Sequence, residues 1–107
     1  MMNDRMKTIY IAGPIKGDPD YRTKFYAAES YLSLKGWIVL NPACLPEGLR
    51  PGCYMPICLA MVEAADALVI FRDVNEYSGA QLEKAYAAYQ KKPVYIGLES
   101  VPVLQDD

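Results

Sequence analysis

The chain contains no histidine among its 107 residues. Histidine is the base of Ser–His and Cys–His mechanisms and the commonest metal ligand, so these mechanisms are excluded. The three cysteines, Cys44, Cys53 and Cys58, are an odd number and form no C-x-x-C pair. We therefore expect no disulfide framework, no metal site and no cofactor. Chemistry on this chain has to use carboxylates, hydroxyls, thiols or amines.

Long apolar and basic stretches are also missing. No segment approaches the roughly 20 apolar residues that a membrane span requires, and the opening residues 1–5 are polar, unlike the start of a signal peptide. Lys and Arg are scattered, the formal net charge is -2 and the pI is about 5.1. This balance argues against tracking the phosphates of long nucleic acid. We expect a cytoplasmic protein that binds neither a membrane nor long nucleic acid.

What the sequence does hold is the composition of a folded domain. It is 52% hydrophobic and 22% charged, with a mean hydropathy of -0.01, as in globular proteins. A chain of this length can bury a core but leaves no room for a second domain. We expect one domain over residues 1–107, with residues 1–6 and 98–107 at its periphery.

Short apolar runs alternate along the chain with segments of helical spacing. The expected strands are residues 8–12, 37–40, 67–71 and 93–96, and the expected helices are residues 21–35, 55–65 and 78–90. Continuous apolar runs such as TIYIA and ALVIF are typical of strands buried on both faces. Strands that alternate with helices form right-handed βαβ units. We predict an α/β fold, a small doubly wound (Rossmann- or flavodoxin-like) parallel sheet of four to five strands flanked by helices.

The topology of such a sheet locates the binding site. Ligands bind outside the carboxyl ends of the strands, because strand-to-helix loops and helix N-termini gather there. The candidate segments are residues 13–20, 41–53 and 72–79. Asp73 lies on this edge and is a candidate catalytic acid. Asp66 comes just before a strand and belongs to the opposite edge.

The first candidate segment begins with Gly13, Pro14, Ile15, Lys16 and Gly17. Glycine allows close approach of the backbone, so this loop could present N–H groups and the Lys16 ammonium to an anion. The spacing differs from that of the G-x-G-x-x-G and Walker loops. An ordinary turn with a solvated lysine is therefore the alternative interpretation.

The third candidate segment leads into a predicted helix through Ser78, Gly79 and Ala80. A helix start of this kind attracts anions. Glu83 follows one turn later, has no lysine or arginine three or four residues away, and points back toward the helix N-terminus. The alternative is a solvent-exposed glutamate that favours the helix. We expect Glu83→Gln to change the free energy of unfolding by no more than about 0.5 kcal/mol, as ordinary surface changes do.

Several motifs in this order resemble the nucleoside 2-deoxyribosyltransferase-like superfamily. They are IYIAGPI at residues 9–15, NP at 41–42, ADA at 65–67 and SGAQLEKA at 78–85. The similarity spans residues 8–96 and points to a small bacterial and phage branch, which is also similar to the 2'-deoxynucleoside 5'-phosphate N-hydrolases. Asn41 and Ala80, which lie in these motifs, join the expected substrate-binding residues.

The resemblance implies a role for each matching position. Glu83 would be the nucleophile that attacks the anomeric carbon of the sugar, and the Tyr10 hydroxyl would help to hold its carboxylate. Lys16, Ser78 and Gly79 would contact a 5'-monophosphate. Cleavage of an N-glycosidic bond passes through an oxocarbenium-like state that a carboxylate stabilises or captures. An incoming base would make the reaction a transfer, and water would make it a hydrolysis.

The resemblance also implies a homodimer or higher homo-oligomer, because related enzymes complete their pockets across a subunit interface. The predicted third helix carries an apolar stripe of Leu82, Tyr86 and Tyr89. This stripe is typical of packing within the domain or of contacts between subunits.

Two positions depart from the pattern of the superfamily. Cys58 stands where related enzymes often carry an aspartate that helps to protonate the leaving base, and Asp73 or Glu76 is a candidate replacement. Related sequences commonly place one residue between the serine or aspartate and the glycine of this motif. Here Ser78 directly precedes Gly79, so Tyr77 is a candidate for the position of that serine or aspartate. Two functions therefore remain open. The chain is an enzyme with a glutamate nucleophile, or a module that binds a nucleoside or nucleotide without turnover.

Overall fold

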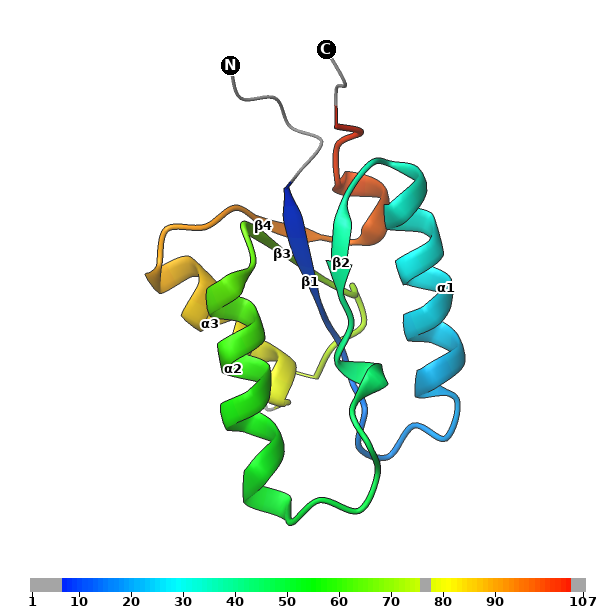
Figure 1. Cartoon of the computed structure of the whole chain (residues 1–107), viewed down its shortest axis with the longest axis vertical. Coiled ribbons are helices and arrows are strands. Elements are labelled where there is room, and N and C mark those ends of the chain that lie inside the picture. Colours follow the sequence, from blue (N-terminus) through cyan, green and yellow to red (C-terminus); the bar gives the residue numbers. More distant parts are fainter. Residues whose placement is uncertain (1–6, 76–77, 105–107) are drawn as a thin grey trace.

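A computed structural model describes residues 7–75 and 78–104 of the chain. Its centre is a four-stranded, entirely parallel sheet in the order β2-β1-β3-β4 (Figure 1). The strands are β1 (Thr8–Ala12), β2 (Ile38–Leu40), β3 (Ala67–Ile70) and β4 (Val94–Ile96). The chain moves outward from β1 to β2 on one side and from β3 to β4 on the other. The predicted doubly wound α/β fold is thereby confirmed, with four strands.

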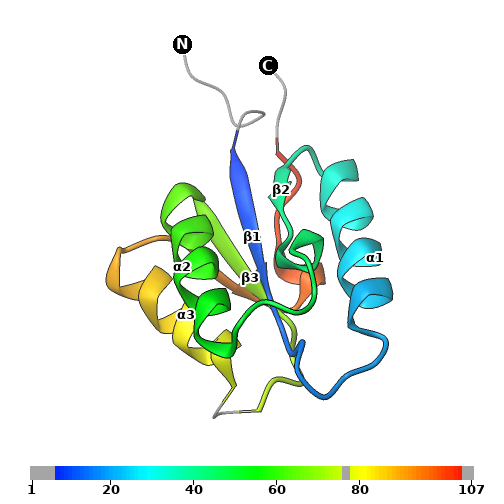
Figure 2. The same ribbon diagram turned by 60° about the horizontal axis from the view of Figure 1, so that its bottom comes forward.

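Three helices cover the two faces of the sheet. Helix α1 (Tyr21–Leu34) lies on one face, and α2 (Tyr54–Ala64) and α3 (Gly79–Tyr89) lie on the other (Figures 1 and 2). Because β1 and β3 are covered on both faces, their apolar residues are almost entirely buried. Phe25, Ala28 and Leu32 form the inner face of α1, so their helical spacing in the sequence reflects a buried stripe.

The connection between β2 and α2 runs over residues 41–53 and folds into two short 3₁₀ turns. These turns are Pro42–Cys44 and Pro51–Cys53, and each begins with a proline. Proline suits the first position of a helical turn because its missing N–H would have no partner there. The long connection thereby becomes a compact wall at the carboxyl edge of the sheet.

Residues 98–104 contribute to the core, although the sequence placed them at the periphery of the domain, and residues 105–107 lie outside the described residues. Val101 is buried between the sheet and α1, and Leu104 packs against the same cluster. The Trp37 indole donates a hydrogen bond to the Pro102 carbonyl at 2.9 Å, and Lys35 Nζ donates one to the Val101 carbonyl. The sequence after β4 shows no helical or strand periodicity, so these long-range contacts could not be predicted from it.

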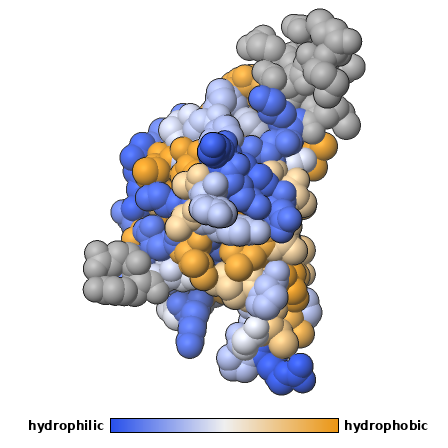
Figure 3. All heavy atoms as spheres, turned by 90° about the vertical axis from the view of Figure 1, so that its left-hand side faces the viewer, coloured by the Kyte–Doolittle hydropathy of each residue, from blue (hydrophilic) through white to orange (hydrophobic). Residues whose placement is uncertain are grey.

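Two further features of the surface bear on function. No helix within residues 7–75 and 78–104 is long and apolar enough to cross a membrane. Apolar side chains also gather on the face formed by α2 and α3 (Figure 3). Among the exposed large hydrophobic side chains are Ile57 of α2 and two residues of α3, Leu82 at 52% and Tyr89 at 83% exposed. The apolar character of α2 is thus only partly explained by packing within the domain.

Candidate active site

A cavity of about 850 Å³ opens at the carboxyl ends of β1 and β3. The chain turns in opposite directions from these two neighbouring strands, so their following loops separate and leave room for a ligand. The cavity is lined by β1, by the loops that follow β1 and β2, by the start of α2 and by the start of α3. The cavity therefore lies at the edge of the sheet where the sequence predicted a binding site.

Glu83 of α3 lies in this cavity and is only 7% exposed. The interpretation of Glu83 as a solvent-exposed helix residue is therefore wrong, because α3 turns this position toward the sheet and α2. Burial disfavours the charged carboxylate and raises the pKa of Glu83 to about 7, and the nearby Tyr10 hydroxyl and Cys58 thiol limit the rise. A carboxyl group with a pKa near neutrality is typical of catalytic sites.

Tyr10 and Cys58 are the polar neighbours of Glu83. Tyr10 comes from the middle of β1 and is 0% exposed, and Cys58 comes from the inner face of α2. The Tyr10 hydroxyl makes no hydrogen bond of normal geometry within residues 7–75 and 78–104. Burial, and then the Glu83 charge, raises the pKa of Tyr10, and burial raises the pKa of Cys58. Both groups therefore keep their protons at neutral pH.

The loop that follows β1 forms one side of the cavity. Gly13, Pro14, Ile15 and Lys16 line it. A Cβ atom at Gly13 would overlap the Phe71 ring, so glycine is required for the loop to pass this close to the end of β3. Among the described residues Lys16 has no carboxylate partner. The loop therefore brings one free ammonium group to the cavity.

The start of α3 forms the adjoining side. Ser78, Gly79 and Ala80 line the cavity, and Ser78 occupies the N-cap without a capping hydrogen bond from its side chain. Its hydroxyl is buried and has no hydrogen-bond partner in the described part of the chain. The first N–H groups of a helix also lack partners within the helix. This end of the cavity therefore offers unused hydrogen-bond donors.

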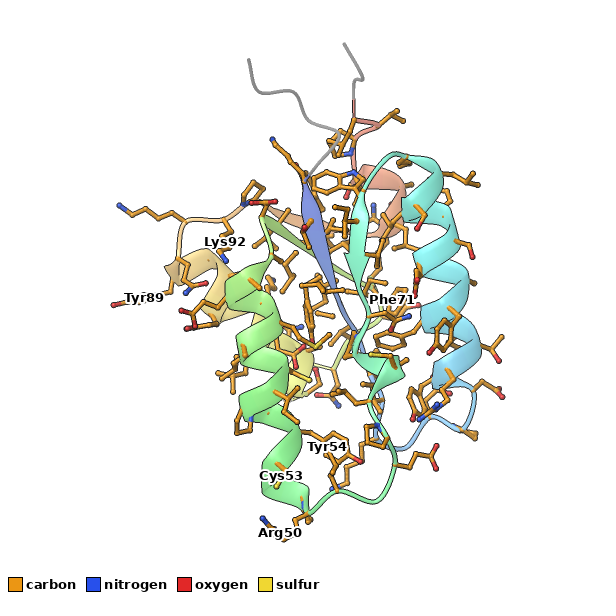
Figure 4. The ribbon with its side chains drawn as sticks, in the orientation of Figure 1. Arg50, Cys53, Tyr54, Phe71, Tyr89 and Lys92 are labelled. Atoms are coloured by element: carbon orange, nitrogen blue, oxygen red, sulfur yellow. The ribbon has the colours of Figure 1, made fainter. Side chains whose placement is uncertain are left out.

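The loop that follows β2 closes the opposite side, and Tyr54 holds it in place. The Tyr54 hydroxyl donates a hydrogen bond to the Pro46 carbonyl at 2.8 Å and accepts one from the Leu49 backbone N–H at 3.2 Å. Figure 4 shows Tyr54 at the start of α2, directed toward this loop. Arg22 Nη2 donates a third hydrogen bond to the Leu45 carbonyl at 3.0 Å. The wall is mostly apolar but is fixed by polar contacts.

Three of the residues expected at the site lie outside this cavity. Asn41 is buried at the start of a 3₁₀ turn, where its Oδ1 accepts a hydrogen bond from the Ala43 N–H and its amide donates one to Glu29. Gly17 and Asp73 line a second hollow of about 610 Å³ on the far side of the loop that follows β1. Lys16 borders both hollows.

Two other candidate residues, Glu76 and Tyr77, lie outside the described residues. Within residues 7–75 and 78–104, no group of three or more Cys, Asp or Glu side chains could hold a metal ion. Because Asp73 lines the second hollow and not the cavity, the described polar neighbours of Glu83 are Tyr10 and Cys58.

Several lining residues were not singled out from the sequence. Leu45 and Glu47 fall in the candidate segment 41–53 but were not named, and Tyr21, Tyr54 and Met55 lie outside the candidate segments. Four of them belong to the long connection after β2 or to the helix start that follows it. The length of that connection was the available signal, since a long loop at the carboxyl edge is often functional.

Comparison with known proteins relates the chain to a family and to a solved structure. No curated protein matches the chain in sequence. The solved structure of a 2-desoxiribosyltransferase from Leishmania mexicana is similar, with a TM-score of 0.68 and 25% sequence identity. The match covers 84% of this chain and 63% of that chain, so this chain spans less than two thirds of its neighbour. The predicted relationship to deoxyribosyltransferase-like proteins is thereby confirmed. Residues 7–96 match the family model described as "Domain of unknown function (DUF4406)", and the chain belongs to that family.

Proposed function

We propose that the chain cleaves the N-glycosidic bond of a nucleoside or nucleoside monophosphate, with Glu83 as the nucleophile. One observation carries this proposal. Glu83 is a buried carboxylate without a cationic partner among residues 7–75 and 78–104, and it lines a cavity beyond the carboxyl end of β1, at the edge where α/β sheets bind ligands. The likeness to a protein described as a deoxyribosyltransferase supports the same class of reaction.

The geometry suits a two-step displacement. In the first step a Glu83 oxygen forms a bond to the anomeric carbon while the bond from that carbon to the base nitrogen breaks with its electron pair, and the nitrogen takes up a proton from water. In the second step water or a second base attacks the same carbon, loses a proton to solvent and releases the Glu83 carboxylate. Tyr10 and Cys58 keep their protons and stand beside the carboxylate, so they can orient it without neutralising its charge.

The test is the release of free base. Purified protein would be incubated with each of the four deoxynucleoside monophosphates, and the products would be separated by chromatography. A free base in the presence of the protein, above the level in its absence, supports the enzyme. If a nucleotide binds and no base is released, the chain is instead a binding module, a function that Cys58 favours because a thiol donates a proton poorly to a leaving base.

A 5'-monophosphate is expected to bind more tightly than the matching nucleoside. Lys16 and the uncapped start of α3 provide an ammonium group and free donors beside the same cavity. Calorimetric titration of dAMP, dCMP, dGMP and dTMP against their nucleosides measures the difference. Lys16→Ala should reduce the preference, and Lys84→Ala, outside the cavity, should leave it unchanged. Equal binding of both ligand types by the wild type would favour a nucleoside as the substrate.

The chain is also expected to form at least a homodimer, most simply through the exposed apolar face of α2 and α3. Ile57, Leu82 and Tyr89 would lose contact with water there, which favours association. Light scattering over a range of concentrations measures the mass in solution. Leu82→Glu should shift the mass toward the monomer, and a wild type that is monomeric throughout would contradict the expectation.

Since nucleotides are intracellular metabolites, we place the proposed activity in the cytoplasm.

A further inference from the structure

The cavity holds a carboxylate whose charge no described residue neutralises. Glu83 is 7% exposed, and its polar neighbours, Tyr10 and Cys58, are neutral groups. A buried carboxylate without a cationic partner is costly, because neither water nor an opposite charge compensates it. A ligand that carries a positive charge into the cavity would remove this cost.

The aromatic groups that line the cavity favour the same kind of ligand. Of the described lining residues, Glu47 and Glu83 are acidic and Lys16 is basic, and Glu47 pairs with the Arg22 guanidinium at 3.5 Å, so Glu83 is the acidic lining residue left without a cationic partner. Tyrosine faces attract cations. The Tyr21 ring already has the Arg22 guanidinium 5.5 Å from its centre. Tyr10 also lines the cavity but is fully buried, so of the three described tyrosines that line it Tyr54 is the one whose ring can face a flat cationic ring.

The leaving group of the reaction leads to the same conclusion. Tyr10 and Cys58 hold their protons firmly, because burial raises the pKa of each. They are therefore poor acids toward a neutral base that departs from the sugar. A base ring that is already positively charged needs no proton, because the electron pair of the broken bond neutralises it.

The geometry points to a nucleotide with a cationic base ring, of the pyridinium or N7-alkylpurinium type, as the preferred ligand of this cavity. For turnover, the inference rests on the proposed function. A Glu83 oxygen forms a bond to the anomeric carbon, and the carbon–nitrogen bond breaks with its electron pair going to the ring nitrogen. The base leaves as a neutral molecule. Water then attacks the anomeric carbon, which releases the Glu83 carboxylate, the sugar phosphate and one proton to solvent.

Binding is tested without any reaction by comparing 1-methylnicotinamide, a cation, with nicotinamide, its neutral counterpart. Calorimetry at pH 8 would be run on the wild type, on Glu83→Gln and on Glu47→Gln. The wild type should bind the cation at least tenfold more tightly, which corresponds to about 1.4 kcal/mol. Glu83→Gln should lose this preference, and Glu47→Gln should keep most of it. Equal affinity in the wild type, or a preference that survives in Glu83→Gln, would overturn the inference.

Turnover separates the inference from the proposed function. The matched substrates are 7-methylguanosine 5'-monophosphate and guanosine 5'-monophosphate, with nicotinamide mononucleotide as the pyridinium example. Base release from the two cationic nucleotides, corrected for spontaneous cleavage, should be at least tenfold faster than from the neutral one. Equal rates would overturn the inference and leave the proposed function standing. A cation preference in binding with no base released from any nucleotide would overturn the proposed function and leave the ligand class standing.

Discussion

Glu83→Gln is expected to abolish base release while the protein stays folded. Glutamine keeps the shape of glutamate but cannot attack the anomeric carbon. Loss of a covalent nucleophile should lower the rate by at least a thousandfold, and each factor of ten corresponds to about 1.4 kcal/mol of activation free energy. Chromatography of free base, with the fastest nucleotide substrate of the wild type, measures the rate. Circular dichroism verifies that the variant has the helix content of the wild type.

The matched control is Glu63→Gln. Glu63 lies on α2 outside the cavity, where its carboxylate accepts a hydrogen bond from the Tyr86 hydroxyl at 3.1 Å. An amide oxygen can accept the same bond, so this variant should release base at the wild-type rate. A Glu83→Gln rate within tenfold of the wild type would refute the covalent mechanism. Equal losses in both variants would show that the effect is structural and not chemical.

The fold could be predicted from the sequence because its signals are local. Continuous apolar runs at β1 and β3 are typical of strands covered on both faces, and both strands are central and buried. The helical spacing of Phe25, Ala28 and Leu32 likewise corresponds to the inner face of α1. The contacts of residues 98–104 could not be predicted, since they depend on where the chain returns in space. No period in the sequence reports such a return.

The position of the cavity was predictable from the sequence, but the environment of Glu83 was not. The strand-and-helix order placed the loops after β1 and β3 at one edge, and the cavity joins them. From the residues three and four positions away on the predicted helix, Glu83 could be either a solvent-exposed residue or a functional one. Only the packing of α3 against Tyr10 and Cys58 shows that it is buried. Asn41 lies in a family motif and was predicted to bind substrate. In the structure its side chain accepts a hydrogen bond at the start of a 3₁₀ turn, a role that the motif did not indicate.

The stability of Glu83→Gln should depend on pH, because the expected limit of about 0.5 kcal/mol assumed a surface position and Glu83 is buried. The pKa of Glu83 is about 7 in the folded protein, against 4.5 for a glutamate side chain exposed to water. Between these pH values the folded state binds more protons than the unfolded state. The wild type therefore loses stability as pH rises from about 4.5 to about 7, by about 3 kcal/mol in total. Glutamine does not ionise, so the variant escapes this loss.

Urea unfolding at pH 4.5, 6 and 8 measures the effect. At pH 4.5 the wild-type carboxyl is protonated in the folded state and resembles the amide, so the two proteins should differ little in free energy of unfolding. At pH 8 the variant should be the more stable protein by about 3 kcal/mol. Glu63→Gln should follow the wild type at every pH, because Glu63 is outside the cavity. Parallel curves for the wild type and Glu83→Gln would mean that the Glu83 charge is already compensated in the folded protein. That outcome would also remove the reason to expect a cationic ligand, because the cavity would then have no uncompensated negative charge to offer it.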